Sequence, residues 1–160
     1  MNIENNNLEF KKAESNLPSS FWETYSAFAN TEGGTIILGV DENNKENPLQ
    51  GVKNPVKIRD DLFALAENKQ KVSHNVLNSN DVEIIDIDGK ETKLIAVTVS
   101  EAHPSKKPVY LNNKLELAYK RLGETDKKAT DEEFKYMIIN ASDDIDNELL
   151  ENFDIEDLNK

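Results

Sequence analysis

Three carboxylates and one lysine near the start of the chain are the residue types that metal-assisted phosphodiester chemistry needs. Glu4 and Glu9 lie near the start of one predicted strand, and Asp41 ends a second. Lys11 shares a strand face with Glu9, because alternate residues of a strand point the same way. If the two strands lie side by side, these groups converge. Oxygen clusters suit Mg²⁺ or Mn²⁺, which activate a water and stabilise the transition state of cleavage.

The same residues also have an ordinary interpretation. The chain holds 31 acidic residues, most of which must be solvated surface groups. Glu9 and Lys11 could also form a charge pair across neighbouring strands. Spacing alone therefore leaves a metal site and a charged surface open as alternatives. Mg²⁺ or Mn²⁺ is expected only if the chain is a nuclease, and no other cofactor is predicted.

Basic residues gather at two places that flank predicted hairpins. With Tyr110 and Tyr119 nearby for stacking, they could form a rim that contacts phosphates. Solvated loops are the open alternative. The residues of this predicted rim are Lys106, Lys107, Lys120, Arg121, Lys127 and Lys128.

Several other chemistries lack the residues they need. The chain contains no cysteine, which excludes thiol catalysis, Cys-ligated zinc and disulfides. His74 and His103 are far apart, and neither has a neighbour at a ligand-like spacing. Gly33 and Gly34 follow a predicted helix and precede a strand, which is the reverse of a phosphate-binding loop. No Gly-x-Ser-x-Gly motif supports a serine hydrolase.

Length and charge predict one domain with an acidic tail. The 160 residues carry a net charge of −12. Residues 143–160 contain eight acidic residues and one lysine, so they account for −7 of that charge. We interpret residues 1–142 as the domain and 143–160 as an acidic linker or short helix. The remaining −5 neither favours nor excludes a nucleic-acid partner.

No apolar run approaches the roughly 20 residues that span a bilayer, and the N-terminus lacks the pattern of a secretory signal. A cytoplasmic protein with no membrane partner is therefore expected.

The elements that must position these residues can be predicted from periodicity. Residues 20–30 have one apolar helical face, with a capping box at Ser20 and Glu23. Gly33 and Gly34 then turn the chain into a buried strand at 35–38, and Gly39 allows a close approach of another backbone.

Further along, two hairpins and two helices are predicted. The last helix begins at a capping box of Thr130 and Glu133 and buries a face that includes Ile138. The expected fold is α+β, a mixed and mostly antiparallel sheet with about three packed helices. The remaining predicted elements are a strand at 8–11, a helix at 57–67, and hairpins at 82–88 with 92–99 and at 109–111 with 115–119.

Two signatures, the first made of two stretches, resemble those of one family and occur in the right order. Residues 8–11 (LEFK) and 27–41 (AFANTEGGTIILGVD), followed by 119–125 (YKRLGET), are similar to the Schlafen/Alba-like DNA-binding domain found at the N-terminus of bacterial transcriptional regulators. The resemblance implies an α+β fold and nucleic-acid association, chiefly with DNA, in a regulator. A region beyond residue 160 would then be missing.

In animal Schlafen proteins the related fold is a metal-dependent ribonuclease with three carboxylates. By this resemblance Glu4, Glu9 and Asp41 would bind the metal, and Lys11 would steady the phosphate or the attacking water. Because those enzymes join two lobes, a single lobe would need to form a homodimer. A third hypothesis is a protein–protein module, docking through the apolar residues of the tail, which are Ile145, Leu149, Leu150 and Phe153.

Overall fold

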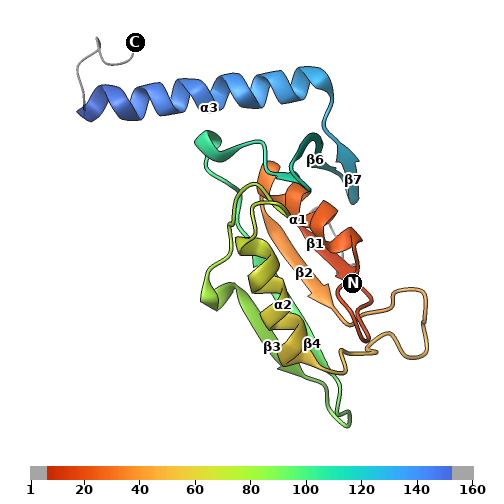
Figure 1. Ribbon diagram of the computed structural model, residues 1–160. Coiled ribbons are helices and arrows are strands. Elements are labelled where there is room, and N and C mark those ends of the chain that lie inside the picture. Colours follow the sequence, from red (N-terminus) through yellow and green to blue (C-terminus); the bar gives the residue numbers. More distant parts are fainter. Residues whose placement is uncertain (1–6, 153–160) are drawn as a thin grey trace.

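The computed structural model describes residues 7–152, with side chains over residues 7–141, and shows two sheets joined by a helix (Figure 1). The first sheet has the order β1-β2-β4-β3 and the second the order β5-β6-β7. The strands are β1 (Leu8–Lys11), β2 (Gly34–Leu38), β3 (Val82–Asp86), β4 (Lys93–Val99), β5 (Tyr110–Leu111), β6 (Lys114–Leu122) and β7 (Thr125–Lys128). The helices are α1 (Ser20–Asn30), α2 (Pro55–Glu67) and α3 (Asp131–Asn152), with short 3-10 turns η1 (Ser79–Asp81) and η2 (Pro104–Lys106).

The α+β class and the three helices confirm the prediction. The pairing is mixed and mostly antiparallel, since only β1 and β2 run parallel among the described strands. The strands divide between two sheets, however, because α1 packs between them and against β6. Among the described residues, no helix is long and apolar enough to cross a membrane.

The α1–turn–β2 unit forms as its sequence predicts. Gly33 turns the chain at φ +74°, and a Cβ on Gly34 would lie 2.8 Å from the Phe28 ring. Ile36 and Leu38 of β2 are fully buried on the face that α1 covers. Gly39 also approaches another backbone closely, because the N–H of Gly51 donates to its carbonyl at 2.7 Å.

The predicted capping box at the start of α1 is wrong. The helix begins at Ser20 with Ser19 as its N-cap, and no side chain caps it. Glu23 instead accepts a hydrogen bond from the Tyr119 hydroxyl at 3.1 Å, and the Ser20 hydroxyl accepts one from Lys11. Tertiary partners therefore take the groups that a local capping box would use.

Both predicted hairpins form, and the chain contains one strand that the sequence pattern missed. The β3–β4 loop spans residues 87–92, so it is longer than the predicted strands at 82–88 and 92–99 would leave. Asn112 and Asn113 have φ of 55° and 60°, which suits the tight turn between β5 and β6. Strand β7 pairs with the end of β6, although its sequence Thr-Asp-Lys-Lys has no apolar alternation.

Helix α3 begins at the predicted capping box. The Thr130 N–H donates to the Glu133 carboxylate at 2.9 Å, and the Glu133 N–H donates to the Thr130 hydroxyl at 3.2 Å. The helix packs against η2 and continues to Asn152, so it runs across the predicted boundary at residue 142. That domain boundary stays a prediction. Ile138 is 44% exposed and so is not part of a buried face.

Asn30 ties α1 to the second sheet. Its amide nitrogen donates to the carbonyls of Val109 and Tyr119, each at 2.9 Å, and its carbonyl accepts from the Val109 N–H at 2.7 Å. Ser26, one turn earlier, donates to the Val109 carbonyl and accepts from the Tyr119 N–H. Two polar side chains thus satisfy buried backbone groups that no neighbouring strand reaches.

Replacing this amide should destabilise the whole fold. We expect Asn30→Ala to lower the free energy of unfolding by about 2–5 kcal/mol, because the Val109 N–H and the Tyr119 carbonyl lose their buried partner. Urea denaturation followed by circular dichroism measures the change. The control Asn43→Ala, at an exposed loop residue, should stay within about 0.5 kcal/mol of the wild type. Equal stability of the two variants would contradict the role of Asn30.

Candidate nucleic-acid interface

A buried ion cluster joins β1, β6 and β7. Arg121 of β6 lies 2.7 Å from the Glu9 carboxylate of β1 and 2.8 Å from the Asp126 carboxylate of β7. Only 3% of the Arg121 side chain is exposed, and its guanidinium lies 5.0 Å from the centre of the Phe28 ring. Thr24 of α1 also donates to Asp126. The cluster therefore fixes β7 against α1 and β1.

Arg121 is a permanent charge in this cluster. Burial alone would lower its pKa, but the hydrogen bonds and charges of Asp126 and Glu9 outweigh burial, so the net effect raises the pKa of the guanidinium. A buried charge of this kind needs its partners, since removing one leaves the other charged and desolvated. Arg121 thus serves the fold rather than presenting its guanidinium at the surface.

The three predicted metal ligands are not seen together. Glu4 lies outside the described residues, and the Glu9 carboxylate is held by Arg121. Asp41 lies 3.8 Å from the Lys12 ammonium. Within residues 7–141, no group of three His, Cys, Asp or Glu side chains is placed to hold a metal ion. The described residues alone do not fit a metal centre, and the three-carboxylate site stays a prediction.

Lys11 and Asp41 do share one polar pocket of about 420 Å³, at the end of β1 and β2. The Lys11 ammonium donates to the Ser20 hydroxyl at 3.2 Å across this pocket from the start of α1. The parallel register of β1 and β2 brings the two strands side by side as predicted.

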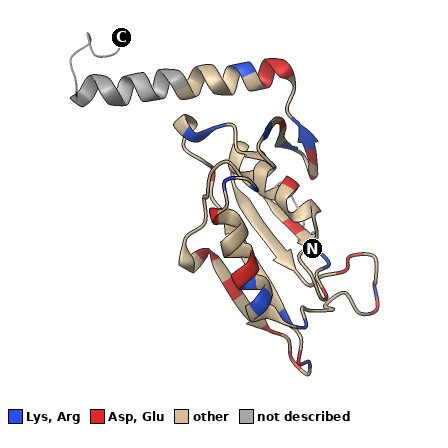
Figure 2. Ribbon diagram, in the orientation of Figure 1, with Lys and Arg blue, Asp and Glu red and all other residues tan. Residues whose placement is uncertain are grey.

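The predicted basic rim divides into engaged and exposed groups. Lys107 pairs with Glu101 at 2.7 Å, and Lys120 pairs with Glu133 at 2.5 Å. The exposed members lie on η2 and on β7, where Figure 2 shows blue segments beneath α3. We call these exposed members, Lys106, Lys127 and Lys128, the lysine rim.

The charge of this region differs in sign from the rest of the chain. Residues 103–128 contain seven Lys or Arg and three acidic residues, a net charge of +4 in a chain of −12. Of the two tyrosines predicted to stack, Tyr110 is half-buried and Tyr119 is buried. Burial, with the charge and hydrogen bond of Glu23, raises the pKa of Tyr119, which stays a neutral donor inside the fold.

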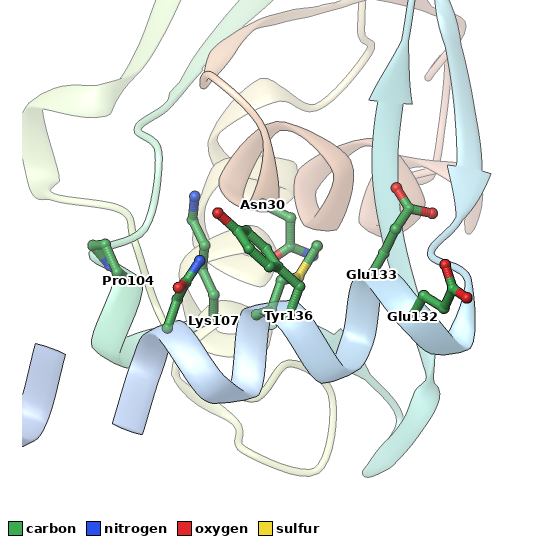
Figure 3. Close-up of a pocket in the computed structure, with 8 residues that line it drawn as sticks. Asn30, Pro104, Lys107, Glu132, Glu133 and Tyr136 are labelled. Carbon is green, nitrogen blue, oxygen red and sulfur yellow. The ribbon is translucent and has the colours of Figure 1, made fainter. Parts of the chain in front are cut away.

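A pocket of about 500 Å³ lies between α3 and the η2 loop, and pattern analysis did not find it (Figure 3). The sequence does show that Tyr136 and Asn140 lie one helical turn apart and so on one face of α3. It does not show that the η2 loop, distant in the sequence, forms the opposite wall of the pocket. We call it the α3 pocket; its lining residues are Asn30, Pro104, Lys107, Glu132, Glu133, Tyr136, Met137 and Asn140.

The fold and its contacts define a small α+β domain in which one helix joins two sheets. The chain belongs to the Schlafen, AlbA_2 family, whose sequence model matches residues 4–130. The family resemblance of the two sequence stretches is thereby confirmed. Among curated proteins, no match to the chain was found.

Two solved structures are similar to this chain. One is the N-terminal domain of a protein from Nitrosomonas europaea described as related to the ATP-dependent DNA helicase RecG. It is 29% identical, with a TM-score of 0.52 over 77% of this chain and 82% of that one. The other is the DIP2311 protein from Corynebacterium diphtheriae, 14% identical with a TM-score of 0.52, which shows the fold alone. The match covers 84% of this chain and 28% of that protein.

The pairing of Glu133 with Lys120 should give the fold a measurable dependence on pH. The hydrogen bonds from Lys120 and from the Thr130 N–H lower the pKa of Glu133 below its ordinary value of 4.5. A carboxyl group with a depressed pKa in the folded state adds stability above its unfolded pKa and loses it as the pH falls through the folded pKa.

We expect Glu133→Gln to lower the free energy of unfolding by at most about 1 kcal/mol at pH 7, because solvent screens this partly exposed pair. The difference from wild type should shrink as the pH falls below about 4.5, measured by urea denaturation at a series of pH values. Glu132→Gln, one residue earlier, is the matched control. A difference that stays constant down to pH 3 would contradict the assignment.

Proposed function

We propose that this chain is a nucleic-acid-binding domain that contacts the phosphates of DNA through the lysine rim, as part of a transcriptional regulator. The observation that carries the proposal is the exposed lysine rim, which lies in a segment, residues 103–128, whose residues sum to +4 in a chain of net charge −12. Phosphate binding depends on such clusters of Lys and Arg, whatever the charge of the rest of the molecule.

Two further observations support the proposal. Lys127 and Lys128 directly follow Asp126 on β7, and the pairing of that strand with β6 and the Asp126–Arg121 ion pair position their backbone. The related protein from Nitrosomonas europaea is described as related to a DNA helicase. A function on DNA for this chain is consistent with that description.

The geometry favours positioning contacts over base reading. Lysine ammonium groups contact phosphates as point charges and carry no sequence information. The regulator role and the predicted homodimer both stay predictions. A homodimer would present two lysine rims to one DNA duplex, which would raise the apparent affinity of the protein for that duplex.

Removing two charges of the rim should weaken binding and its dependence on salt. We expect the double variant Lys127→Gln with Lys128→Gln to bind duplex DNA more weakly than wild type. Its slope of log K against log salt should be smaller in magnitude by about 2, one unit for each lost phosphate contact. Fluorescence anisotropy titrations at several salt concentrations give both quantities.

The matched control is Lys45→Gln with Lys53→Gln, which removes the same charge from exposed residues outside the 103–128 segment. If this control changes the slope as much as the rim variant, net charge rather than the rim governs binding. Binding of wild type that ignores salt would contradict the proposal itself.

A divalent-metal-dependent endoribonuclease is the second candidate. It is favoured by one observation, that Lys11 and Asp41 line a common polar pocket beside the strand that carries Glu9. A nuclease of this kind also requires the Glu4 carboxylate to lie close to Asp41 and Lys11. It further requires a metal ion that competes with Arg121 for the Glu9 carboxylate.

Incubating wild type and Asp41→Asn with labelled tRNA, in Mn²⁺ or in chelator, decides between the candidates. If the chain only binds nucleic acid, the tRNA stays intact under every condition. Fragments that appear with wild type in Mn²⁺, and that vanish with chelator and with Asp41→Asn, would instead establish the nuclease. Lys45→Gln is the control for a surface change that should leave either result unaltered.

A further inference from the structure

The α3 pocket has the chemistry of a site for a flat, partly polar ligand. Its volume of about 500 Å³ falls within the range of pockets that hold small ligands. We propose that it takes one unpaired nucleobase from a single-stranded segment of nucleic acid. This inference rests on the proposed function and adds to it a preference for single strands.

Tyr136 supplies the stacking surface. Its side chain is 67% exposed and reaches from α3 across the pocket, as Figure 3 shows. The sulfur-bearing side chain of Met137 and the ring of Pro104 add apolar walls. An exposed aromatic ring beside lysines is the arrangement on which unpaired bases stack, and stacking tolerates any base because every base has a π-face.

The charges around the pocket would orient a bound nucleotide. Lys106, on the η2 turn that forms one wall, is exposed and can contact a phosphate. The opposite end carries Glu132, which is exposed, and Glu133, whose carboxylate already bonds Lys120 and the Thr130 N–H. A phosphate is repelled at that end, whereas a group that donates hydrogen bonds is attracted.

This polarity predicts which bases fit best. Adenine and cytosine carry exocyclic amino groups, which donate to carboxylates, while thymine offers a carbonyl oxygen at the corresponding position. Glu132 should therefore favour adenine and cytosine over thymine. Asn140 can both donate and accept, so it can bond the remaining polar atoms of either favoured base.

A base in a duplex cannot reach this pocket, because it is stacked and paired inside the helix. The lysine rim by itself would hold single strands and duplexes alike through their phosphates. The two parts of the surface can therefore be tested separately.

The test is fluorescence anisotropy of the full chain with labelled single-stranded oligo-dA, oligo-dC and oligo-dT, and with a duplex of the same length. We expect Tyr136→Ala to weaken binding of oligo-dA and oligo-dC about tenfold and to leave duplex binding unchanged. Tyr136→Phe should retain wild-type affinity because it keeps the ring. Glu132→Gln should narrow the preference for oligo-dA and oligo-dC over oligo-dT.

The matched control is Ile139→Ala, three residues along the same helix and 58% exposed, which does not line the pocket. Circular dichroism verifies that each variant is folded. Equal affinity of Tyr136→Ala and Ile139→Ala for single strands, or an equal loss of duplex binding in Tyr136→Ala, overturns the inference while the proposed function stands. Wild type that binds neither single strands nor duplex overturns both, and leaves a peptide or small molecule as the occupant of the pocket.

Discussion

The buried Arg121 guanidinium is the constraint on which the arrangement of this domain depends. A charge with 3% of its side chain exposed is tolerated only while carboxylates surround it, and those carboxylates come from β1 and β7. Because Arg121 must keep these two carboxylates, the second sheet packs against α1 and against β1 of the first sheet. It also sets the place of Lys127 and Lys128, which follow Asp126 directly along β7.

The same cluster gives Glu9, one of the predicted metal ligands, a structural role. Glu9 has the residue type and strand position of a metal ligand, but its carboxylate already neutralises a cation that the protein itself supplies. A guanidinium and a divalent metal ion have similar electrostatic effects on nearby carboxylates, and only one can occupy a given set of oxygen atoms. A metal ion at Glu9 would therefore have to compete with the Arg121 guanidinium for the carboxylate oxygens.

The sequence predicts those parts of the fold that local physics decides. The glycine turn before β2 forms because it requires a positive φ, which Gly33 adopts without steric cost. The capping box of α3 forms because the side chains of Thr130 and Glu133 bond each other's backbone N–H groups. The capping box at Ser20 and Glu23 fails because Tyr119, 96 residues away from Glu23 in the chain, captures the glutamate. Local rules hold where no distant partner offers a better bond.

The candidate site likewise combines features set by local sequence with features set by distant residues. Lys120 and Arg121 are adjacent on β6 and so point to opposite faces of its sheet, and one of those faces packs against α1. Which of them points inward depends on Glu9 and Asp126, and their positions follow from long-range pairing that periodicity does not encode. The α3 pocket could not be predicted from the sequence for a similar reason. Pro104 and Tyr136 are 32 residues apart in the chain and line one pocket only in the folded structure.

Among the strands that the structure describes, β7 is at the edge of its sheet and pairs on one side with β6. An edge of this kind can recruit strands from other molecules, which leads to aggregation. Lysines are among the residues that natural proteins place on such edges to prevent this, because two charged edges repel each other. Lys127 and Lys128 are charges of this kind on the edge strand β7. Selection against aggregation would favour charges at these positions whether or not the domain binds nucleic acid.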